Sequence, residues 1–250
     1  MLLLIDKPTW LTSQDAISAV KKHLREPARD ALSLEDREAG LKPPKIKIWH
    51  SGTLDPMASW LLIAATDKDT KQLYHLTGLD KSYIATINFS IITDTWDMDF
   101  WKEFKQLEMV EQIHAPTLSQ LQHKLDSIIG THDLPLTPFS AKKINGRKLY
   151  EYAREWKAIF LTVPMTVYGY EILDYQFPLL TCRLDVASGA YIRSIAHRLG
   201  RQFDIWWTLT MLRRIIIGEY SIEHIKNPKL ATWDEKGIFY SVIQNGIYDK

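Results

Sequence analysis

Strand patterns and helix patterns follow one another along this chain in no regular order. Apolar runs at 2–5 and 61–65 and a period-two alternation over 83–89 indicate strands. Apolar residues spaced three and four apart after Ser13 and over 192–203 indicate helices. No strand–helix unit repeats, so a regular parallel sheet is disfavoured. We therefore predict an α+β fold with a mixed, mostly antiparallel central sheet flanked by helices.

Further local signals complete this outline. Ser13 is the expected N-cap of the first helix. Residues 25–47 are charged, contain three prolines and keep no period, so we expect an exposed insertion loop with one short helix. The remaining expected elements are helices at 70–77, 118–129 and 148–155, a tight turn at Asn145-Gly146, and strands at 160–163, 166–174 and 180–186.

Composition limits the class of protein. With 250 residues, 46% hydrophobic and 24% charged, the chain can bury a core in one domain or one domain plus an insertion. One cysteine, Cys182, excludes an internal disulfide and fits a cytoplasmic protein. No apolar run approaches the roughly 18 residues of a membrane helix, and no metal-ligand spacing is present. We expect no membrane association, no metal and no cofactor.

The most informative short motif is Trp-His-Ser-Gly-Thr-Leu-Asp-Pro-Met at 49–57. Asp55 stands between the turn-forming Gly52 and the φ-restricted Pro56, which holds its carboxylate on a defined loop. Asp-Pro and Ser-Gly are common turn formers, so spacing alone predicts only a turn. The surrounding residues, and further motifs in the same order along the chain, point to a catalytic role.

Over residues 2–220 the chain resembles the TruB family of tRNA pseudouridine synthases. The loop at 49–57 is similar to the family's nucleophile segment, and the other matching stretches are Leu-Leu-Ile-Asp-Lys-Pro at 3–8, Lys-Ser-Tyr at 81–83, Thr-Asp-Thr-Trp-Asp at 93–97, Pro-Phe-Ser-Ala-Lys-Lys-Ile-Asn-Gly-Arg-Lys-Leu-Tyr-Glu-Tyr-Ala-Arg at 138–154, Ser-Gly-Ala-Tyr-Ile-Arg-Ser at 188–194 and Leu-Arg-Arg at 212–214.

The resemblance implies an isomerase that converts the T-loop uridine at position 55 of tRNA into pseudouridine. It implies the pseudouridine synthase fold with an inserted RNA-gripping segment, here as a catalytic domain over 1–225 that contains the 25–47 loop. Residues 226–250 are then a short C-terminal tail, too short for the RNA-binding PUA domain of many relatives. The expected partner is the T-arm stem-loop of tRNA, with no obligate protein partner.

The same resemblance implies roles for six residues. Asp55 is the nucleophile, attacking either the base or the sugar carbon, and Arg193 is the cation that keeps it ionised. His50 fills the gap left when the uridine leaves its stack, at a cost of a few kcal/mol. Tyr83 stacks on the uracil, and Tyr191 and Leu212 complete the pocket. Taken without the family, Tyr83 and Leu212 would be core residues, His50 a loop histidine and Arg193 a solvated charge.

A net charge of +1 does not announce an RNA-binding protein, so local cations must carry any phosphate contact. Two clusters are candidates, although a charged run is more often only a solvated face. The clusters are Lys142, Lys143, Arg147 and Lys148 beside the tight turn, and Arg198, Arg201, Arg213 and Arg214 near the end.

Nine tryptophans accompany only eleven glycines, about 4% of the chain against a usual ~7%. Where the family pattern has Gly, this chain has Trp10, Trp49, Trp60, Trp156 and Trp206; Trp96 and Trp207 fall where small residues are common, and Trp101 and Trp233 cannot be placed. We hypothesise that UGA codons for glycine were translated as tryptophan. The alternative is that these tryptophans are genuine and fill the core or stack on bases.

Two other functions stay open at this level. A guide-RNA-dependent synthase of related sequence would carry a PUA domain and protein partners, which the short C-terminus disfavours. A catalytically impaired tRNA-binding or tRNA-folding protein of the same fold would follow if genuine Trp49 and Trp60 crowd the Asp55 loop.

Overall fold

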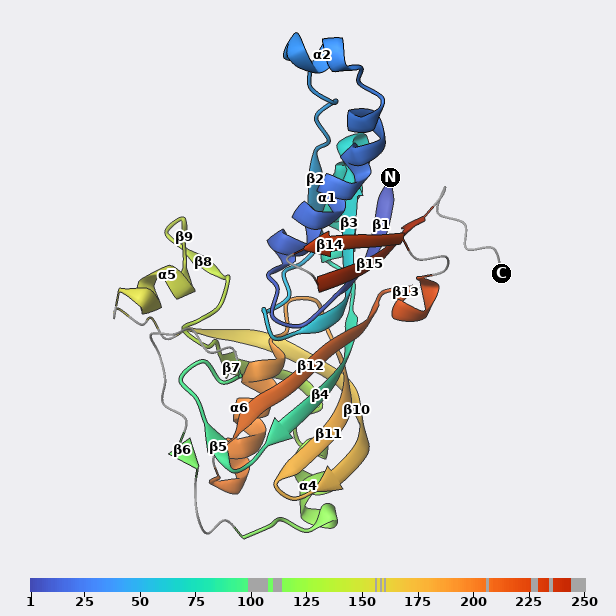
Figure 1. Ribbon diagram of the computed structural model, residues 1–250. Coiled ribbons are helices and arrows are strands. Elements are labelled where there is room, and N and C mark those ends of the chain that lie inside the picture. The colour runs from blue at the N-terminus through green and yellow to red at the C-terminus, as the bar shows by residue number, and fades with distance from the viewer. Residues whose placement is uncertain are drawn as a thin grey trace. The chain divides into compact units, whose positions relative to one another are not determined.

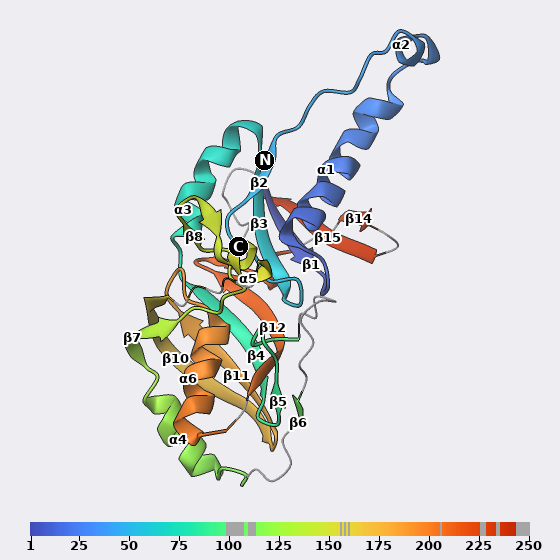
Figure 2. The same ribbon diagram turned by 90° about the vertical axis from the view of Figure 1, so that its left-hand side faces the viewer.

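The computed structural model describes residues 1–98, 108–109, 114–155, 157, 159, 161–205, 207–225, 229–233 and 236–243. The chain divides into two compact units, Met1–Leu79 with Ile215–Lys250, and Asp80–Arg214. Figures 1 and 2 show the elements of each unit from two directions. The second boundary falls within strand β12 (Thr208–Ile217), so one continuous strand contributes residues to both units.

The first unit is built on an antiparallel sheet around β1 (Leu2–Lys7). On one side β1 pairs with β3 (Ser59–Thr66), with Leu4 opposite Ile63. On the other it pairs with β15 (Lys236–Ile243), which continues to β14 (Lys229–Trp233). Short β2 (Ile48–His50) pairs with the outer side of β3, and β13 (Tyr220–Ser221) pairs with the last residues of β12.

Both faces of the two central strands are buried, because helices cover each of them. Leu2, Leu4, Leu61 and Ile63 belong to a core cluster that also contains residues of α3 (Leu73–Thr77). The alternate residues point the other way, where α1 (Ser13–Asp30) contacts β1 and β2. This explains why β1 and β3 are near-continuous apolar runs and lack alternation. Burial of each large aliphatic side chain contributes about 1.5–3 kcal/mol.

Helix α1 differs from the prediction at both ends. Its N-cap is Thr12, whose hydroxyl accepts from Asp15 N–H in a capping box, so Ser13 is already helical. The helix continues through Pro27 to Asp30, whereas we expected a loop from residue 25. Pro27 removes one backbone hydrogen bond, but the helix propagates beyond it. The expected short helix of the insertion is α2 (Leu34–Glu38), which lies beyond the C-terminal end of α1 (Figure 2).

The segment after residue 225, predicted as a tail, contains strands where it is described. Strand β15 places Ile5 opposite Tyr240, and Ile238 and Tyr240 are buried. Their alternation with exposed Gly237 and Phe239 is the period-two pattern of a half-buried strand, which the charged flanks obscure. The described part of residues 226–250 therefore contributes two strands to the first unit.

The second unit has a sheet in the order β12-β4-β11-β10-β7. Strand β4 (Lys81–Asn88) pairs antiparallel with β11 (Leu179–Val186), which pairs antiparallel with β10 (Thr162–Gln176), and β10 with β7 (Gly130–Pro135). A single parallel bridge joins Asp97 to Leu209. These pairings and the flanking helices confirm the predicted α+β class with a mostly antiparallel sheet.

Helices cover this second sheet. Helix α6 (Ile192–Phe203) packs beside α4 (Leu118–Asp126) and against β7. Ile192, Ile195, Ala196 and Leu199 are buried, as the helical spacing predicted. The described part also contains the short paired strands β5 (Ile91–Ile92) and β6 (Glu108–Met109).

The predicted turn at Asn145-Gly146 is confirmed. It joins β8 (Lys143–Ile144) to β9 (Arg147–Lys148), and both turn residues have positive φ, +50° and +80°, as a tight hairpin requires. Helix α5 (Leu149–Arg154) follows directly.

The strand prediction was partly wrong. Expected strands at 160–163 and 166–174 are one strand, β10, because Pro164 is accommodated opposite Asp133 of the edge strand β7. Phe160 lies outside the described residues. On the neighbouring β11, Cys182 is fully buried, and burial raises the pKa of its thiol to about 12.

Candidate active site

The loop that carries Asp55 connects β2 to β3 and is tied to the start of α1. The Leu54 N–H donates to Ser13 Oγ at 2.9 Å, and the Ser13 hydroxyl lies 3.3 Å from Leu54 O. Ser51 N–H donates to Ile63 O at 2.9 Å. Hydrogen bonds that are buried in this way hold a loop in one conformation, because breaking them leaves unsatisfied groups. Asp55, one residue after Leu54, is half-buried.

Lys7 supports the same loop from β1. Its side chain is fully buried, and its ammonium donates to Leu11 O (2.6 Å), Pro8 O (3.0 Å) and Pro56 O (3.2 Å). Carbonyl oxygens replace the water that the ammonium loses on burial. Lys7 is not among the predicted site residues; its sequence signal is a lysine at the end of an apolar strand, next to proline.

His50 stands at the entrance to the loop. It is the last residue of β2, opposite Ala64, and is half-buried. Gly52 N–H approaches its Nδ1 at 3.4 Å, a long hydrogen bond. At the other end Ala58 N–H donates to Asp55 O at 3.0 Å and closes a turn around Pro56. His50 and Asp55 therefore belong to one ordered loop of the first unit.

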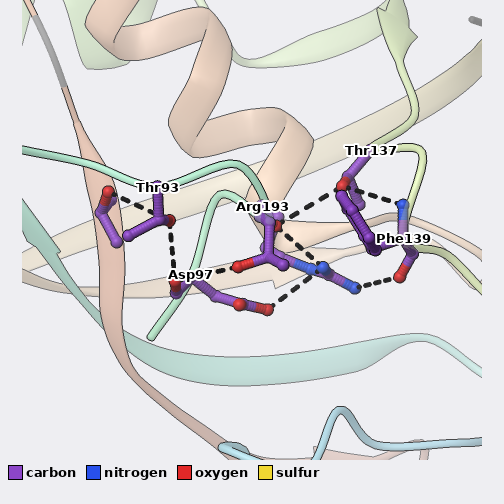
Figure 3. Close-up of polar contacts among 7 residues, drawn as sticks. Thr93, Asp97, Thr137, Phe139 and Arg193 are labelled. Carbon is purple, nitrogen blue, oxygen red and sulfur yellow. Dashed lines mark hydrogen bonds and ion pairs between the residues drawn. The ribbon is translucent and has the colours of Figure 1, made fainter. Parts of the chain in front are cut away.

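Arg193 lies at the start of α6 in the second unit and is buried. Figure 3 shows its guanidinium between Asp97 and two backbone carbonyls. Nη1 is 3.1 Å from Asp97 Oδ2 and donates to Thr95 O at 3.0 Å, while Nη2 donates to Phe139 O at 3.4 Å. Asp97 is 1% exposed, so this is a buried ion pair supported by hydrogen bonds.

The turn at 93–97 shapes this ion pair. The hydroxyls of Thr93 and Thr95 both donate to Asp97 O, at 2.7 and 3.1 Å, and Thr137 Oγ1 donates to Thr95 O at 3.4 Å. The predicted motif at 93–97 thus has a physical function that the sequence analysis did not assign. It holds the backbone of Asp97, whose carboxylate pairs with Arg193.

The three predicted pocket residues are placed on elements near this centre. Tyr83 is on β4 and Leu212 on the neighbouring β12; both are buried, at 7% and 5% exposure. Tyr191 is the half-buried residue that precedes α6, two positions before Arg193, and its N–H points at the Met165 sulfur, 3.3 Å away. Burial of Tyr83 and Leu212 fits both a pocket role and the alternative that they are core residues.

Lys81 is a further buried cation, at the start of β4. Its ammonium donates to Ser188 Oγ at 3.2 Å. Burial, the largest cause, and the nearby charge of Arg214 together lower the pKa of Lys81 to about 8, while Asp80 opposes the shift. Arg214 is itself buried, so it is not a surface phosphate ligand.

The predicted basic hairpin is only partly available to a phosphate. Lys142, Lys143 and Arg147 are exposed. However, Arg147 is paired with Glu155 and Glu151 and lies over the Tyr152 ring, 4.7 Å from its centroid. Its charge is therefore already compensated, and the lysines carry most of the positive potential of this turn.

The described residues contain neither a metal-ligand group nor a membrane-spanning helix. They contain no group of three or more His, Cys, Asp or Glu side chains arranged to hold a metal ion. None of the helices they form is long and apolar enough to cross a membrane.

The fold and the motif-bearing loops place this chain among the pseudouridine synthases. The family "TruB family pseudouridylate synthase (N terminal domain)" matches residues 39–192. The "tRNA pseudouridine synthase B" of Caldicellulosiruptor saccharolyticus is 34% identical over 225 residues, covering 89% of this chain and 69% of that protein. The protein of the same name from Flavobacterium johnsoniae is 33% identical, with 89% and 90% covered. The chain belongs to the TruB family.

Solved structures show the same fold at low sequence identity. A chain of "Structure of H/ACA RNP bound to a substrate RNA containing 2'-deoxyuridine" is 20% identical with a TM-score of 0.57, covering 88% of this chain and 48% of that chain. A chain of "Crystal Structure of a Cbf5-Nop10-Gar1 Complex" has the same identity and TM-score, with 50% of it covered. The present chain thus spans about half the length of these two.

Proposed function

We propose that this protein is a tRNA pseudouridine synthase that isomerises the T-loop uridine at position 55. The observation that carries the proposal is the Asp55 loop: a half-buried carboxylate on a segment held by Ser13 and Lys7. Its relatives over nearly the whole chain are named tRNA pseudouridine synthase B. A fixed carboxylate is the nucleophile that the reaction requires.

The reaction balances without a redox partner. The bond between N1 of uracil and C1′ of the ribose breaks, and a bond between C5 and C1′ forms. The proton on C5 is lost and N1 gains a proton, so substrate and product are isomers. Asp55 forms a covalent adduct with either the base or the sugar carbon while the uracil turns. Its carboxylate leaves again when the C5 bond is complete.

Arg193 is the proposed cation of the site. A carboxylate that is closed off from water by RNA needs a positive neighbour to stay ionised. The ion pair with Asp97 and the carbonyls of Thr95 and Phe139 hold the guanidinium in place before substrate arrives. Preorganisation of this kind lowers the reorganisation required during catalysis.

The remaining roles concern the flipped base. Removing a uridine from its stack costs a few kcal/mol, and stacking on an aromatic ring returns about 1–3 kcal/mol. In the proposal Tyr83 provides that ring, His50 occupies the vacated position in the RNA, and Tyr191 and Leu212 line the pocket. The family resemblance and the ordered backbone of these residues support this assignment.

Tritium release from a tRNA transcript labelled at C5 of uridine tests the proposal. The wild-type protein should release one tritium per transcript, because only the C5 proton of the target uridine is lost. Asp55→Asn should abolish release while tRNA binding persists, since it removes the nucleophile and keeps the side-chain shape.

Asp67→Asn is a matched control, because Asp67 is an exposed carboxylate of the same unit. It should release tritium at the wild-type rate. Absence of release from any tRNA by the wild-type protein would reject the proposed reaction.

A second candidate is a tRNA-binding or tRNA-folding protein without catalysis. The observation that favours it is that Trp10 and Trp49 expose 53% and 55% of their surface beside this loop, where indoles can stack on bases. The backbone N–H of Trp10 donates to Pro56 O at 2.7 Å, so the backbone at residue 10 is bonded to the loop. Binding without tritium release, unchanged in Asp55→Asn, would favour this function.

A further inference from the structure

Three tryptophans have a backbone conformation that bulky residues avoid. The φ angles of Trp10, Trp60 and Trp96 are +67°, +77° and +65°. The other non-glycine residues with positive φ in the described part are Asp67, Asn145 and Asp204, whose short polar side chains tolerate it. A left-handed conformation costs most residues about 1–2 kcal/mol, and for a large residue it is a clear outlier.

Each of these positions lies on a segment that supports the candidate site. Trp10 follows β1, and its N–H donates to Pro56 O next to Asp55. Trp60 lies near the start of β3, opposite Lys7. Trp96 N–H donates to Thr93 O in the turn that presents Asp97 to Arg193. Glycine is the residue that adopts such φ values without a steric penalty.

Indole packing does not account for the three conformations. Trp10 is 53% exposed, so its ring gains little from burial. Trp60 is only half-buried. Trp96 does stack on His197, with ring centroids 4.3 Å apart, but the stack does not require a positive φ. The chain is also short of glycine, with eleven in 250 residues.

We propose that positions 10, 60 and 96 are glycine in the protein as its cell makes it, encoded by UGA codons that the cell translates as glycine. Tryptophan is normally encoded by UGG alone, so UGA gives tryptophan only under an altered reading. One base separates UGA from the glycine codon GGA. With glycine at position 10, an exposed indole disappears from the edge of the Asp55 loop. The inference does not depend on the proposed reaction.

The codons and the native peptides test this directly. We expect UGA at all three positions and peptides of the protein from its own cells that carry glycine there. UGG codons, or tryptophan in those peptides, would overturn the assignment.

Recombinant variants give a second, independent readout. Trp10→Gly, Trp60→Gly and Trp96→Gly should each raise the unfolding midpoint, because strain is removed. Trp49→Gly is the matched control for Trp10→Gly: Trp49 is as exposed as Trp10 but lies in β2 without positive φ, so glycine there should lower the midpoint or leave it unchanged. Three midpoints that fall as far as the control, or further, would contradict the strain argument.

A separate observation concerns α1 in the first unit. One face of this helix and the returning segment enclose a cavity of about 390 Å³. Lys21, Lys22, Arg25 and Arg29 line it, with Glu26 and Pro43. Lys21, Lys22 and Arg29 are each three or four residues from Arg25 and so share its helix face, and Arg29 Nε also contacts Asp30 Oδ1 at 3.2 Å. This is a dense positive cluster for a chain whose net charge is only +1.

Two side chains of this cavity define its chemistry. Glu26 contacts His23 at 3.0 Å, which directs its carboxylate to its own helix. Arg25 donates one Nη2 hydrogen to Pro43 O at 3.3 Å, whereas its Nε is buried without a hydrogen-bond partner. A buried N–H with no acceptor is unfavourable unless a ligand supplies one. A phosphate oxygen would satisfy both charge and hydrogen bonding.

The position of this cavity relates it to the Asp55 loop. Helix α1 begins at Ser13, which is bonded to Leu54. At 1.5 Å per residue, Lys21 lies about 12 Å and Arg29 about 24 Å along the helix from Ser13. The geometry points to a binding site for backbone phosphates of the RNA whose uridine reaches Asp55. This second inference rests on the proposed RNA substrate.

Binding measurements at several salt concentrations test the phosphate site. Lys22→Ala/Arg25→Ala should weaken binding of unmodified tRNA transcript about tenfold and reduce the salt slope by about two, one for each lost contact. Lys68→Ala/Lys71→Ala, an equal charge loss on the exposed segment 67–72, should leave both unchanged. Equal tRNA affinities and equal salt slopes for the two double variants would contradict the proposed phosphate site.

Tritium release separates this site from the reaction. At saturating tRNA the Lys22→Ala/Arg25→Ala variant, called the groove variant below, should release tritium at the wild-type rate, because it retains Asp55. Weaker binding in the groove variant together with no release by the wild type would reject the reaction and retain the phosphate site. Release without any difference in binding would retain the reaction and reject the site.

Discussion

Arg193 is a buried cation whose desolvation cost is offset by the carboxylate of Asp97 and by hydrogen bonds. Moving a guanidinium out of water is unfavourable, and Asp97 with two carbonyls compensates for it. The two Thr hydroxyls that bind Asp97 O fix the turn rather than the carboxylate. Asp97 is therefore a principal contributor to the charge balance at this centre.

Replacing that side chain should be costly in a specific way. Asp97→Asn leaves Arg193 charged and buried, so we expect a loss of about 3–5 kcal/mol in the free energy of unfolding. The double variant Asp97→Asn/Arg193→Met should recover most of this loss, because the buried guanidinium that lost its carboxylate is removed as well. Urea denaturation of both measures the coupling; equal stability of the single and double variants would contradict the charge argument.

Lys81 makes the free energy of unfolding depend on pH. Its pKa is about 8 in the folded protein, below the ordinary 10.5. Between pH 8 and 10 the side chain of Lys81 is protonated in the unfolded chain and largely deprotonated in the folded protein. The contribution of Lys81 to the free energy of unfolding therefore rises with pH over this range. Below pH 8 both states are charged and the contribution is constant.

Urea denaturation at pH 7, 8, 9 and 10 checks this. Lys81→Met should lack the rise seen in the wild type over pH 8–10, whereas Lys71→Met, an exposed lysine, should keep it. The comparison cancels other titrating groups, such as Tyr170, whose pKa is raised to about 12. Parallel curves for the wild type and Lys81→Met would exclude the assignment.

At the level of elements, α1 and the Asp55 loop act as one structure. The N-cap Thr12 and the next residue, Ser13, have different roles. Thr12 caps the N-terminus of the helix, and Ser13 accepts a hydrogen bond from the loop. The helix start therefore determines where Leu54, and with it Asp55, lies.

Two substitutions separate these functions. Thr12→Ala should lower the free energy of unfolding by about 1 kcal/mol, with little effect on turnover at saturating tRNA. Ser13→Ala leaves the buried Leu54 N–H unsatisfied, costs about 1–3 kcal/mol and should also reduce turnover by loosening the loop. Tritium release at a temperature where both variants are folded is the measurement; equal turnover would contradict the positioning role.

Hydrophobic periodicity predicted elements well where one face is buried, and poorly where contacts with other elements determine whether a strand or helix forms. The helix at 192–203 and the alternation at 83–89 needed only local spacing. Strand β15 and the continuation of α1 through Pro27 depend on contacts with β1 and with the returning segment, which no local pattern contains. Boundaries set by tertiary packing are the least predictable feature of a sequence.

The same limit applied to the candidate site. Motif order identified Asp55 and Arg193, but not the supporting Lys7, which reaches Pro56 from 49 positions away. Nor could spacing reveal that Asp97 pairs with Arg193, because the two are separated by most of the second unit. The roles of the six predicted residues remain predictions for the experiments above.

For the whole molecule, a net charge of +1 limits non-specific attraction to nucleic acids. We expect an unrelated DNA duplex of matched length to bind at least about 100-fold more weakly than tRNA at 0.15 M salt, since local contacts rather than overall charge carry affinity. Competition binding with labelled tRNA measures this. Comparable affinities would indicate that overall electrostatics dominates.

The burial of Cys182 has a practical consequence for experiments on the two units. With a pKa near 12, a fraction on the order of one in ten thousand of this thiol is ionised at neutral to mildly alkaline pH, and the side chain is fully buried. Maleimide and nitroxide reagents therefore have no competing reactive cysteine in the native sequence. One engineered surface cysteine in each unit would accept a fluorophore or spin-label pair, so that the distance between the units can be followed as tRNA is added.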